Sequence, residues 1–157
     1  MRAMRRADVA AVQAIERAAF STPWTAATFA NLLRWTDRCE ALVLEAEVSD
    51  HDEPLLAGYA VLRFVEEEGE LVNIAIRADL RGQGLGSILL DAVIAAAIGR
   101  GLRHLFLEVR RSNLVAQQMY EARGFQSVGV RKGYYSRPVE DARVMLLRLA
   151  GAEEEAS

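Results

Sequence analysis

The sequence predicts an α/β (α+β) domain, and three observations support that fold class. Short apolar runs bounded by turn residues occupy the first half of the chain, as is typical of β-strands. Beyond residue 70, such runs alternate with helical patterns in the order strand, helix, strand, helix, strand. A glycine-rich turn, Arg81-Gly82-Gln83-Gly84-Leu85-Gly86, joins one of these strands to the longest helix.

Two helices and two strands are expected before residue 65. Apolar residues at helical spacing predict a helix over 9–19 with Asp8 as its N-cap, and Thr25 is the expected N-cap of a second helix over 26 to about 35. Runs over 40–48 and 55–64 predict two strands, which the polar turn 49–54 joins into an antiparallel hairpin.

The second half begins with a turn at 66–69 and a strand over 70–76. The long helix follows from about residue 84 to 99. Seven apolar residues are expected on its inner face: Leu85, Ile88, Leu89, Ala92, Val93, Ala96 and Ala97. Further along come a strand over 104–109, a helix over 114–123 that Gly124 ends, and strands over 125–130 and 142–149.

The composition excludes several classes of protein. A chain of 157 residues with 52% apolar and 26% charged residues suits one globular domain. Its net charge of -3 disfavours a nucleic-acid binder, which would carry a basic face. The single cysteine, Cys39, forms no internal disulfide, two histidines give no metal-ligand spacing, and the longest apolar run is too short to span a membrane. We therefore expect a cytoplasmic protein without a metal.

The glycine-rich turn predicts an anion site. Glycines let the backbone approach a ligand, and the N-terminus of the following helix offers unpaired N–H groups with a positive partial charge. A pyrophosphate fits such a site. The turn lacks the Lys of a nucleotide-hydrolysing phosphate loop, and Gly82-x-Gly84-x-Gly86 departs from the Rossmann spacing.

The turn resembles the pyrophosphate loop of the GNAT superfamily of acetyl-CoA-dependent N-acetyltransferases, whose pattern is Gln/Arg-x-x-Gly-x-Gly/Ala. Arg81, Gly84 and Gly86 match this pattern. The resemblance covers about residues 1–149 as a single domain and leaves an acidic tail at 150–157. It implies the GNAT fold, a mixed and mostly antiparallel central sheet of about six to seven strands, flanked by about four helices and splayed at the fourth strand. It also implies acetyl-CoA as the acetyl donor.

Within the superfamily, the chain resembles the RimI type, which acetylates the N-terminal alanine of a small-subunit ribosomal protein. The matching residues are Pro23-Trp24-Thr25, Asn73-Ile74-Ala75-Ile76, Leu107-Glu108-Val109-Arg110, Asn113, Arg131-Lys132-Gly133-Tyr134-Tyr135 and Glu140-Asp141-Ala142. Gly133 departs from the pattern, since many relatives carry Asn before the paired tyrosines.

The resemblance also implies which residues bind acetyl-CoA. The strand backbone at Ile74, Ala75 and Ile76 would pair with the pantetheine amides. The Asn113 side chain would contact the same moiety, although Asn113 is also a good helix N-cap. The phosphates would be bound by the loop of Arg81, Gly82, Gln83, Gly84, Leu85, Gly86 and Ser87, in which the Leu85 side chain points into the core.

Acetyl transfer to an amine needs a base for the amine and an acid for the departing thiolate. Glu108 either lies among buried apolar strand residues, which tend to raise the pKa of a carboxyl, or is an exposed strand residue. Tyr120 is, by its pattern, a core aromatic of a short helix. The resemblance implies that Glu108 is the general base, acting through water, and that Tyr120 protonates the thiolate.

Several aromatic residues are packing residues by composition, but the resemblance places them beside the acceptor groove. They are Trp24 in a loop after the first helix, and Tyr134 with Tyr135 in the connection to the last strand. An acidic cluster is either a solvated turn or a surface that attracts a basic peptide. It consists of Glu66, Glu67, Glu68 and Glu70.

Three functions stay open at this point. The first is acetylation of the N-terminal peptide of a ribosomal protein by direct transfer, with Glu108 and Tyr120 as base and acid. The second is the same chemistry on another amine, such as a lysine side chain, a polyamine or an antibiotic. The third is a coenzyme A-binding module without turnover, which the presence of Glu108 and Tyr120 disfavours. We expect no direct nucleic-acid contact and no membrane contact, and a monomer is the working assumption.

Overall fold

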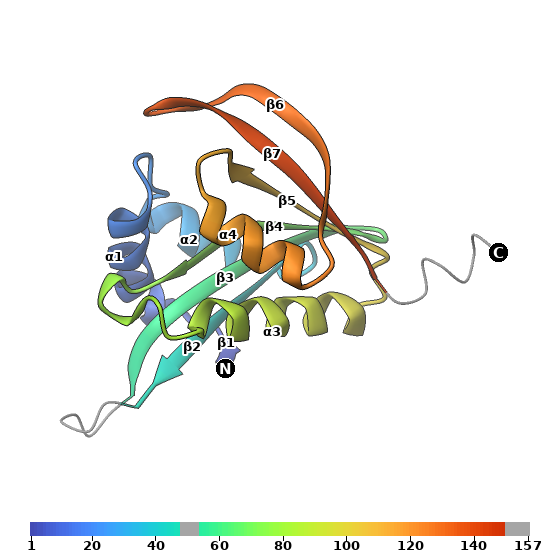
Figure 1. Ribbon diagram of the computed structural model, residues 1–157. Helices are drawn as coiled ribbons and strands as arrows, with labels where there is room; N and C mark the ends of the chain where they lie inside the picture. The colour runs from blue at the N-terminus through green and yellow to red at the C-terminus, as the bar shows by residue number, and fades with distance from the viewer. Residues whose placement is uncertain (48–53, 150–157) are drawn as a thin grey trace.

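The computed structural model describes residues 1–47 and 54–149, which form a central sheet with helices on both faces (Figure 1). The strands are β1 (Arg2–Ala3), β2 (Cys39–Ala46), β3 (Leu55–Val65), β4 (Glu68–Ile76), β5 (His104–Arg110), β6 (Gln126–Ser136) and β7 (Val139–Arg148). The helices are α1 (Val9–Ala19), α2 (Ala26–Leu32), α3 (Leu85–Gly99) and α4 (Leu114–Ala122), with short 3-10 turns at Arg6–Asp8 and Ala78–Leu80.

The seven strands found in the described residues form one sheet in the order β1-β2-β3-β4-β5-β7-β6. Every neighbouring pair is antiparallel except β4 and β5, which are parallel and are connected through α3. The α/β fold class, the mostly antiparallel sheet and the hairpin of β2 with β3 are thereby confirmed.

β4 and β5 part halfway along their length. They pair only over residues 68–71 and 104–107, and in Figure 1 they run together at the right and diverge toward the left. The bend coincides with an irregularity in β4. Its residues 71 and 73 pair with two successive residues of β3, so Val72 between them is an extra residue, a β-bulge that bends the strand. The expected splay at the fourth strand is confirmed.

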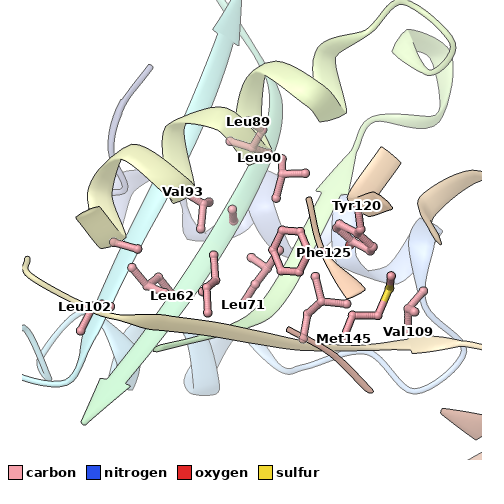
Figure 2. Packing of buried hydrophobic residues seen from close by; sticks show 14 of the residues in the cluster. Leu62, Leu71, Leu89, Leu90, Val93, Leu102, Val109, Tyr120, Phe125 and Met145 are labelled. Atoms are coloured by element: carbon pink, nitrogen blue, oxygen red, sulfur yellow. The ribbon is translucent and has the colours of Figure 1, made fainter. Parts of the chain in front are cut away.

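Two apolar clusters fill the space between the sheet and its helices. On one face, Val12 of α1 and Phe29 of α2 pack with Tyr59 of β3. On the other face, α3 and α4 cover the sheet, and Figure 2 shows Leu89 and Leu90 of α3 on the side of the helix that faces the strands. The sheet is therefore the middle of three layers, and the gap between β4 and β5 lies between two covered faces.

The expected helices are present, with differences at their ends. Asp8 precedes α1 but does not cap it with its side chain, which instead accepts hydrogen bonds from the Arg2 guanidinium at 2.7 and 2.8 Å. Thr25 caps α2 as expected, since its hydroxyl accepts from the Thr28 N–H at 3.2 Å. α2 ends at Leu32 rather than near residue 35.

The strands of the C-terminal half differ more from expectation. β6 extends to Ser136 instead of ending near residue 130, because it is an exposed edge strand whose polar residues carry no alternating pattern. Tyr134 and Tyr135 therefore lie in a strand and not in a connecting loop. β1 is only two residues long, too short to give a pattern. Val48, the turn at 49–53 and the tail at 150–157 lie outside the described residues.

One expected core position on α3 is wrong. Ile88 is 51% exposed, whereas Leu90, which was not expected inside, is fully buried. Apolar residues occupy nearly the whole circumference of this helix, so their spacing alone does not define the inward face.

These two faces of α3 give a matched pair of variants. Replacing the fully buried Leu89 (Leu89→Ala) should lower the free energy of unfolding by about 2–5 kcal/mol, because it leaves a cavity in the larger apolar cluster. Ile88→Ala, one residue away and half exposed, should cost under about 1 kcal/mol. Urea denaturation followed by circular dichroism measures both, and equal losses would contradict this assignment of the inward face.

Candidate active site

A cleft of about 900 Å³ opens where β4 and β5 part. Its walls include residues 70–76 of β4 and 108–110 of β5. One end lies at the start of α3 and along α4, and the other end is lined by the loop between α1 and α2 and by residues 134–136 of β6. The cleft thus brings together the residues that the sequence assigned to an acceptor and part of the group that it assigned to a cofactor.

The glycine-rich turn reaches the cleft through Arg81 and Gly86, and the other residues of the loop do not line it. Gly82 and Gly84 have φ of 79° and 78°, in the left-handed region that residues with side chains rarely adopt. Gly84 is the N-cap of α3, and no described side chain caps the helix, so the first N–H groups of α3 have no partner within it. Gly86 lines the cleft, and a Cβ at this position would lie only 3.4 Å from Met119 Sδ. The turn can therefore hold an anion such as a pyrophosphate on backbone N–H groups.

The remaining residues of the loop take different positions. Arg81 lines the cleft and donates from Nε to the Ile76 carbonyl at 3.3 Å. Leu85 packs against the core, as expected. Gln83 is exposed and Ser87 is half-buried, so their side chains are not fixed by the core.

β4 offers a free backbone edge to the cleft. Ile74, Ala75 and Ile76 pair with β3 on one side, and no described strand pairs with them on the other. All three residues line the cleft. Unpaired strand edges bind extended chains that carry amides, because the main chain supplies both donors and acceptors. The geometry fits the expected pairing with a pantetheine chain.

Asn113 and Tyr120 reach the cleft from the two ends of α4. The Asn113 side chain accepts from the Ala116 N–H at 3.2 Å, so its capping role is confirmed, and it also lines the cleft. Tyr120 is 5% exposed and packs on Phe125 with ring centroids 5.6 Å apart, and it too lines the cleft. Burial raises the pKa of the Tyr120 phenol, which keeps the hydroxyl protonated. Tyr120 is thus both a core residue and a protonated hydroxyl at the cleft wall.

Glu108 lies on β5 immediately beyond its last pairing with β4. Its side chain is 14% exposed, so the alternative of an exposed strand residue is wrong. Oε1 forms an ion pair with Arg131 Nε at 3.0 Å, and Oε2 is buried with no hydrogen-bond donor among the described residues. Buried carboxylate oxygens are normally satisfied, so Oε2 is available to a water or to a ligand N–H in the cleft.

The expected acceptor residues gather at the other end of the cleft. Trp24 packs on Phe29 with ring centroids 5.4 Å apart, and it lines the cleft together with Tyr134 and Tyr135. The two tyrosine rings meet edge to face, 5.0 Å apart, and the Arg110 guanidinium lies 4.1 Å from the Tyr135 ring centroid. Burial raises the pKa of Tyr135 to about 12, so its hydroxyl is a neutral donor here.

Glu16 is a candidate that the sequence reasoning missed. It is 1% exposed and accepts a hydrogen bond from the Tyr59 hydroxyl at 2.9 Å. Asn73 Nδ2 donates to both oxygens of its carboxylate, at 2.9 Å from Oε2. Glu16 and Asn73 both line the cleft. Burial raises the pKa of Glu16, and these hydrogen bonds oppose the shift. The available signal was its place on the helical stripe between Val12 and Ala19, where a carboxylate needs buried partners.

The acidic cluster is partly neutralised. Glu67 pairs with Arg103, Glu70 pairs with Arg63, and of the four glutamates only Glu70 lines the cleft. Within residues 1–47 and 54–149, no group of three or more His, Cys, Asp or Glu is placed to hold a metal ion. None of the helices in this part of the chain has both the length and the apolar character needed to cross a membrane.

Comparison with known proteins gives consistent matches. Residues 9–125 match the family model of the Acetyltransferase (GNAT) family. The [ribosomal protein bS18]-alanine N-acetyltransferase of Escherichia coli (strain K12) is 34% identical over 145 residues, which are 91% of this chain and 93% of that protein. A Bacillus subtilis (strain 168) protein, to which its name assigns the same activity provisionally, is 37% identical over 145 residues, which are 92% of each chain. The crystal structure of the Escherichia coli ribosomal-protein-S18-alanine N-acetyltransferase is similar with a TM-score of 0.78 and 33% identity, over 94% of this chain and 92% of that one.

The buried carboxylate of Glu16 should make stability depend on pH. Because its pKa is raised in the folded state, its contribution to stability is complete below the ordinary carboxyl pKa and is lost as pH rises through the folded pKa. Glu16→Gln cannot ionise, so the free energy of unfolding of this variant should improve relative to wild type as pH rises from about 4 to about 8. Urea denaturation across this range measures the difference. Glu47→Gln, at an exposed position, is the control, and a difference that shrinks with rising pH would refute the assignment.

Proposed function

Because the chain belongs to the Acetyltransferase (GNAT) family, we propose that it transfers acetyl from acetyl-CoA to the α-amine of an N-terminal alanine in a small-subunit ribosomal protein. The family expected from the sequence is confirmed, and the protein is an acetyltransferase. The observation that carries the finer proposal is the 34% identity, over nearly the whole of both chains, to the Escherichia coli bS18-alanine N-acetyltransferase.

Acetyl-CoA supplies an activated acetyl group as a thioester, and GNAT enzymes use it as donor. In this chain the N–H groups at the start of α3, with Arg81 beside them, would hold the pyrophosphate. The free edge at residues 74–76 would pair with the pantetheine amides. Asn113 lies at the same end of the cleft and would contact the pantetheine. The thioester would then lie near the point where β4 and β5 part.

Two proton transfers complete the proposed reaction. Glu108 takes the proton from the attacking amine, through a water at the buried Oε2. The new N–C bond forms as the C–S bond breaks, and Tyr120 gives its proton to the departing sulfur. Direct transfer needs no acyl-enzyme, and the lone thiol supports this, since Cys39 is buried in β2 and does not line the cleft.

The acceptor peptide would enter at the end of the cleft lined by Trp24, Tyr134 and Tyr135. Glu70 also lines the cleft, and the acidic cluster as a whole would attract a basic peptide, with an effect that weakens as salt rises. We regard residues 1–149 as one catalytic domain that acts as a monomer in the cytoplasm, where ribosomal proteins are made. Another amine acceptor is the second candidate, since the aromatic residues that line the acceptor end can also pack on other amines.

A peptide panel tests the acceptor. Peptides that differ only in the first residue, together with polyamines and a peptide with a blocked N-terminus and a free lysine, are assayed by release of free thiol from acetyl-CoA. Ala-starting peptides should give the highest kcat/KM, and the blocked peptide should give none. Faster turnover of polyamines or of the lysine peptide would defeat the assignment to an N-terminal alanine, and thiol release with no amine would point to hydrolysis.

Two variants test the assigned proton transfers. Glu108→Gln and Tyr120→Phe should each lower kcat by about 10²–10⁴-fold, because each removes one proton acceptor or donor while preserving shape. Their Kd for acetyl-CoA, measured by titration calorimetry, should stay within about twofold of wild type, since neither side chain belongs to the loop that would bind the phosphates. A variant that retains more than a tenth of the wild-type kcat would remove that residue from its proposed role.

A further inference from the structure

Glu16, Tyr59 and Asn73 form a buried polar cluster that the proposed acid and base leave unused. An ionised carboxylate can only accept hydrogen bonds, so the Asn73 amide must present its NH2 group to Glu16. Its oxygen, Oδ1, therefore lies at the opposite side of the amide. Among the described residues no donor bonds to Asn73 Oδ1. This oxygen is also not among the buried side-chain atoms that lack a hydrogen-bond partner, which are Gln13 Oε1 and Glu108 Oε2. Since Asn73 lines the cleft, Oδ1 is an acceptor open to a ligand.

Asn73 and Glu108 lie across the gap from each other. The last pair between the two strands is Leu71 of β4 with Leu107 of β5. Glu108 is the next residue after Leu107, and Asn73 lies two residues after Leu71. Leu107 and Val109 belong to the apolar cluster under α3 and α4, so Glu108 between them points to the other face of the sheet. Ala75, two residues after Asn73, belongs to the cluster under α1 and α2, so Asn73 points to that same face.

We propose that Asn73 binds the acceptor amine through Oδ1 and that Glu16 and Tyr59 hold the amide in that orientation. The inference rests on the proposed transfer to an amine. A neutral amine carries two N–H groups and one lone pair. When one N–H donates to Asn73 and the other faces Glu108, the lone pair is directed into the gap, where the thioester carbonyl would lie. Asn73 would thus contact substrate, and Glu16 would be a positioning residue that acts through Asn73.

The surroundings of the cluster suit this role. Glu16 comes from α1, Tyr59 from β3 and Asn73 from β4, so three packed elements fix one amide. The Tyr59 hydroxyl and the Asn73 amide both donate to the Glu16 carboxylate, and hydrogen bonds in such a chain polarise one another, which strengthens Oδ1 as an acceptor. The negative charge behind the amide also favours a group that donates a hydrogen bond to Oδ1 over an apolar group of the same shape.

A cycle of protein and ligand variants tests the contact. Two ligands are compared: the best peptide substrate of the wild type, and its desamino analogue, in which hydrogen replaces the α-amine. The Kd of each is measured in the presence of coenzyme A for the wild type, Asn73→Ala and Glu16→Gln. The wild type should prefer the amine by about tenfold, which is the size of one good hydrogen bond. Asn73→Ala should lose most of that preference, and Glu16→Gln should lose part of it. Asn31→Ala, on the exposed surface of α2, is the control and should keep it.

The outcomes separate this inference from the proposed function. If the wild type acetylates the peptide but Asn73→Ala keeps the full preference for the amine, the contact is wrong while the function stands. If Asn73→Ala weakens both ligands and coenzyme A equally, the residue is only structural and the inference fails. Asn73→Ser, which is smaller but polar, provides a second variant should the alanine variant not fold. Absence of any peptide turnover by the wild type would instead refute the proposed function.

Discussion

The parting of β4 and β5 is the constraint on which the site depends. Two parallel strands that pair over four residues each and then separate leave main-chain N–H and C=O groups without partners on both sides of a gap. Such groups are costly to bury unless water or a ligand satisfies them. The bulge at Val72 bends β4 at this point, so the gap is built into the register of the sheet. A ligand with amides of its own can then complete the sheet.

The gap also determines where side chains meet. α3 begins beside the end of β4, which puts a helix N-terminus at one mouth of the cleft. β5 carries Glu108 and β4 carries Asn73 on the same face, on opposite sides of the opening. α4 contributes Tyr120 from the other face. The proposed binding of an anionic tail, of an extended chain and of an amine would thus follow from one break in a ladder of hydrogen bonds.

The sequence predicted the parts of the fold that depend on local pattern. α1 matches its expected range, the hairpin of β2 and β3 is present, and Gly84 has the positive φ that the turn requires. Features that depend on distant contacts escaped prediction. The inward face of α3 is set by packing, which buries Leu90 and exposes Ile88. The pair of Glu16 and Asn73 joins positions 57 residues apart and requires the bulge that turns Asn73 toward α1.

The most direct measurement of the central claim is amide hydrogen exchange by NMR, with and without coenzyme A. The free edge should exchange readily in the protein alone, and binding should slow exchange at amides within residues 72–76 of β4 and 84–87 at the start of α3, because those N–H groups gain partners. Amides of β2, far from the cleft, should be unchanged. Tight binding without added protection in either segment would contradict the claim that the break between β4 and β5 is the binding site.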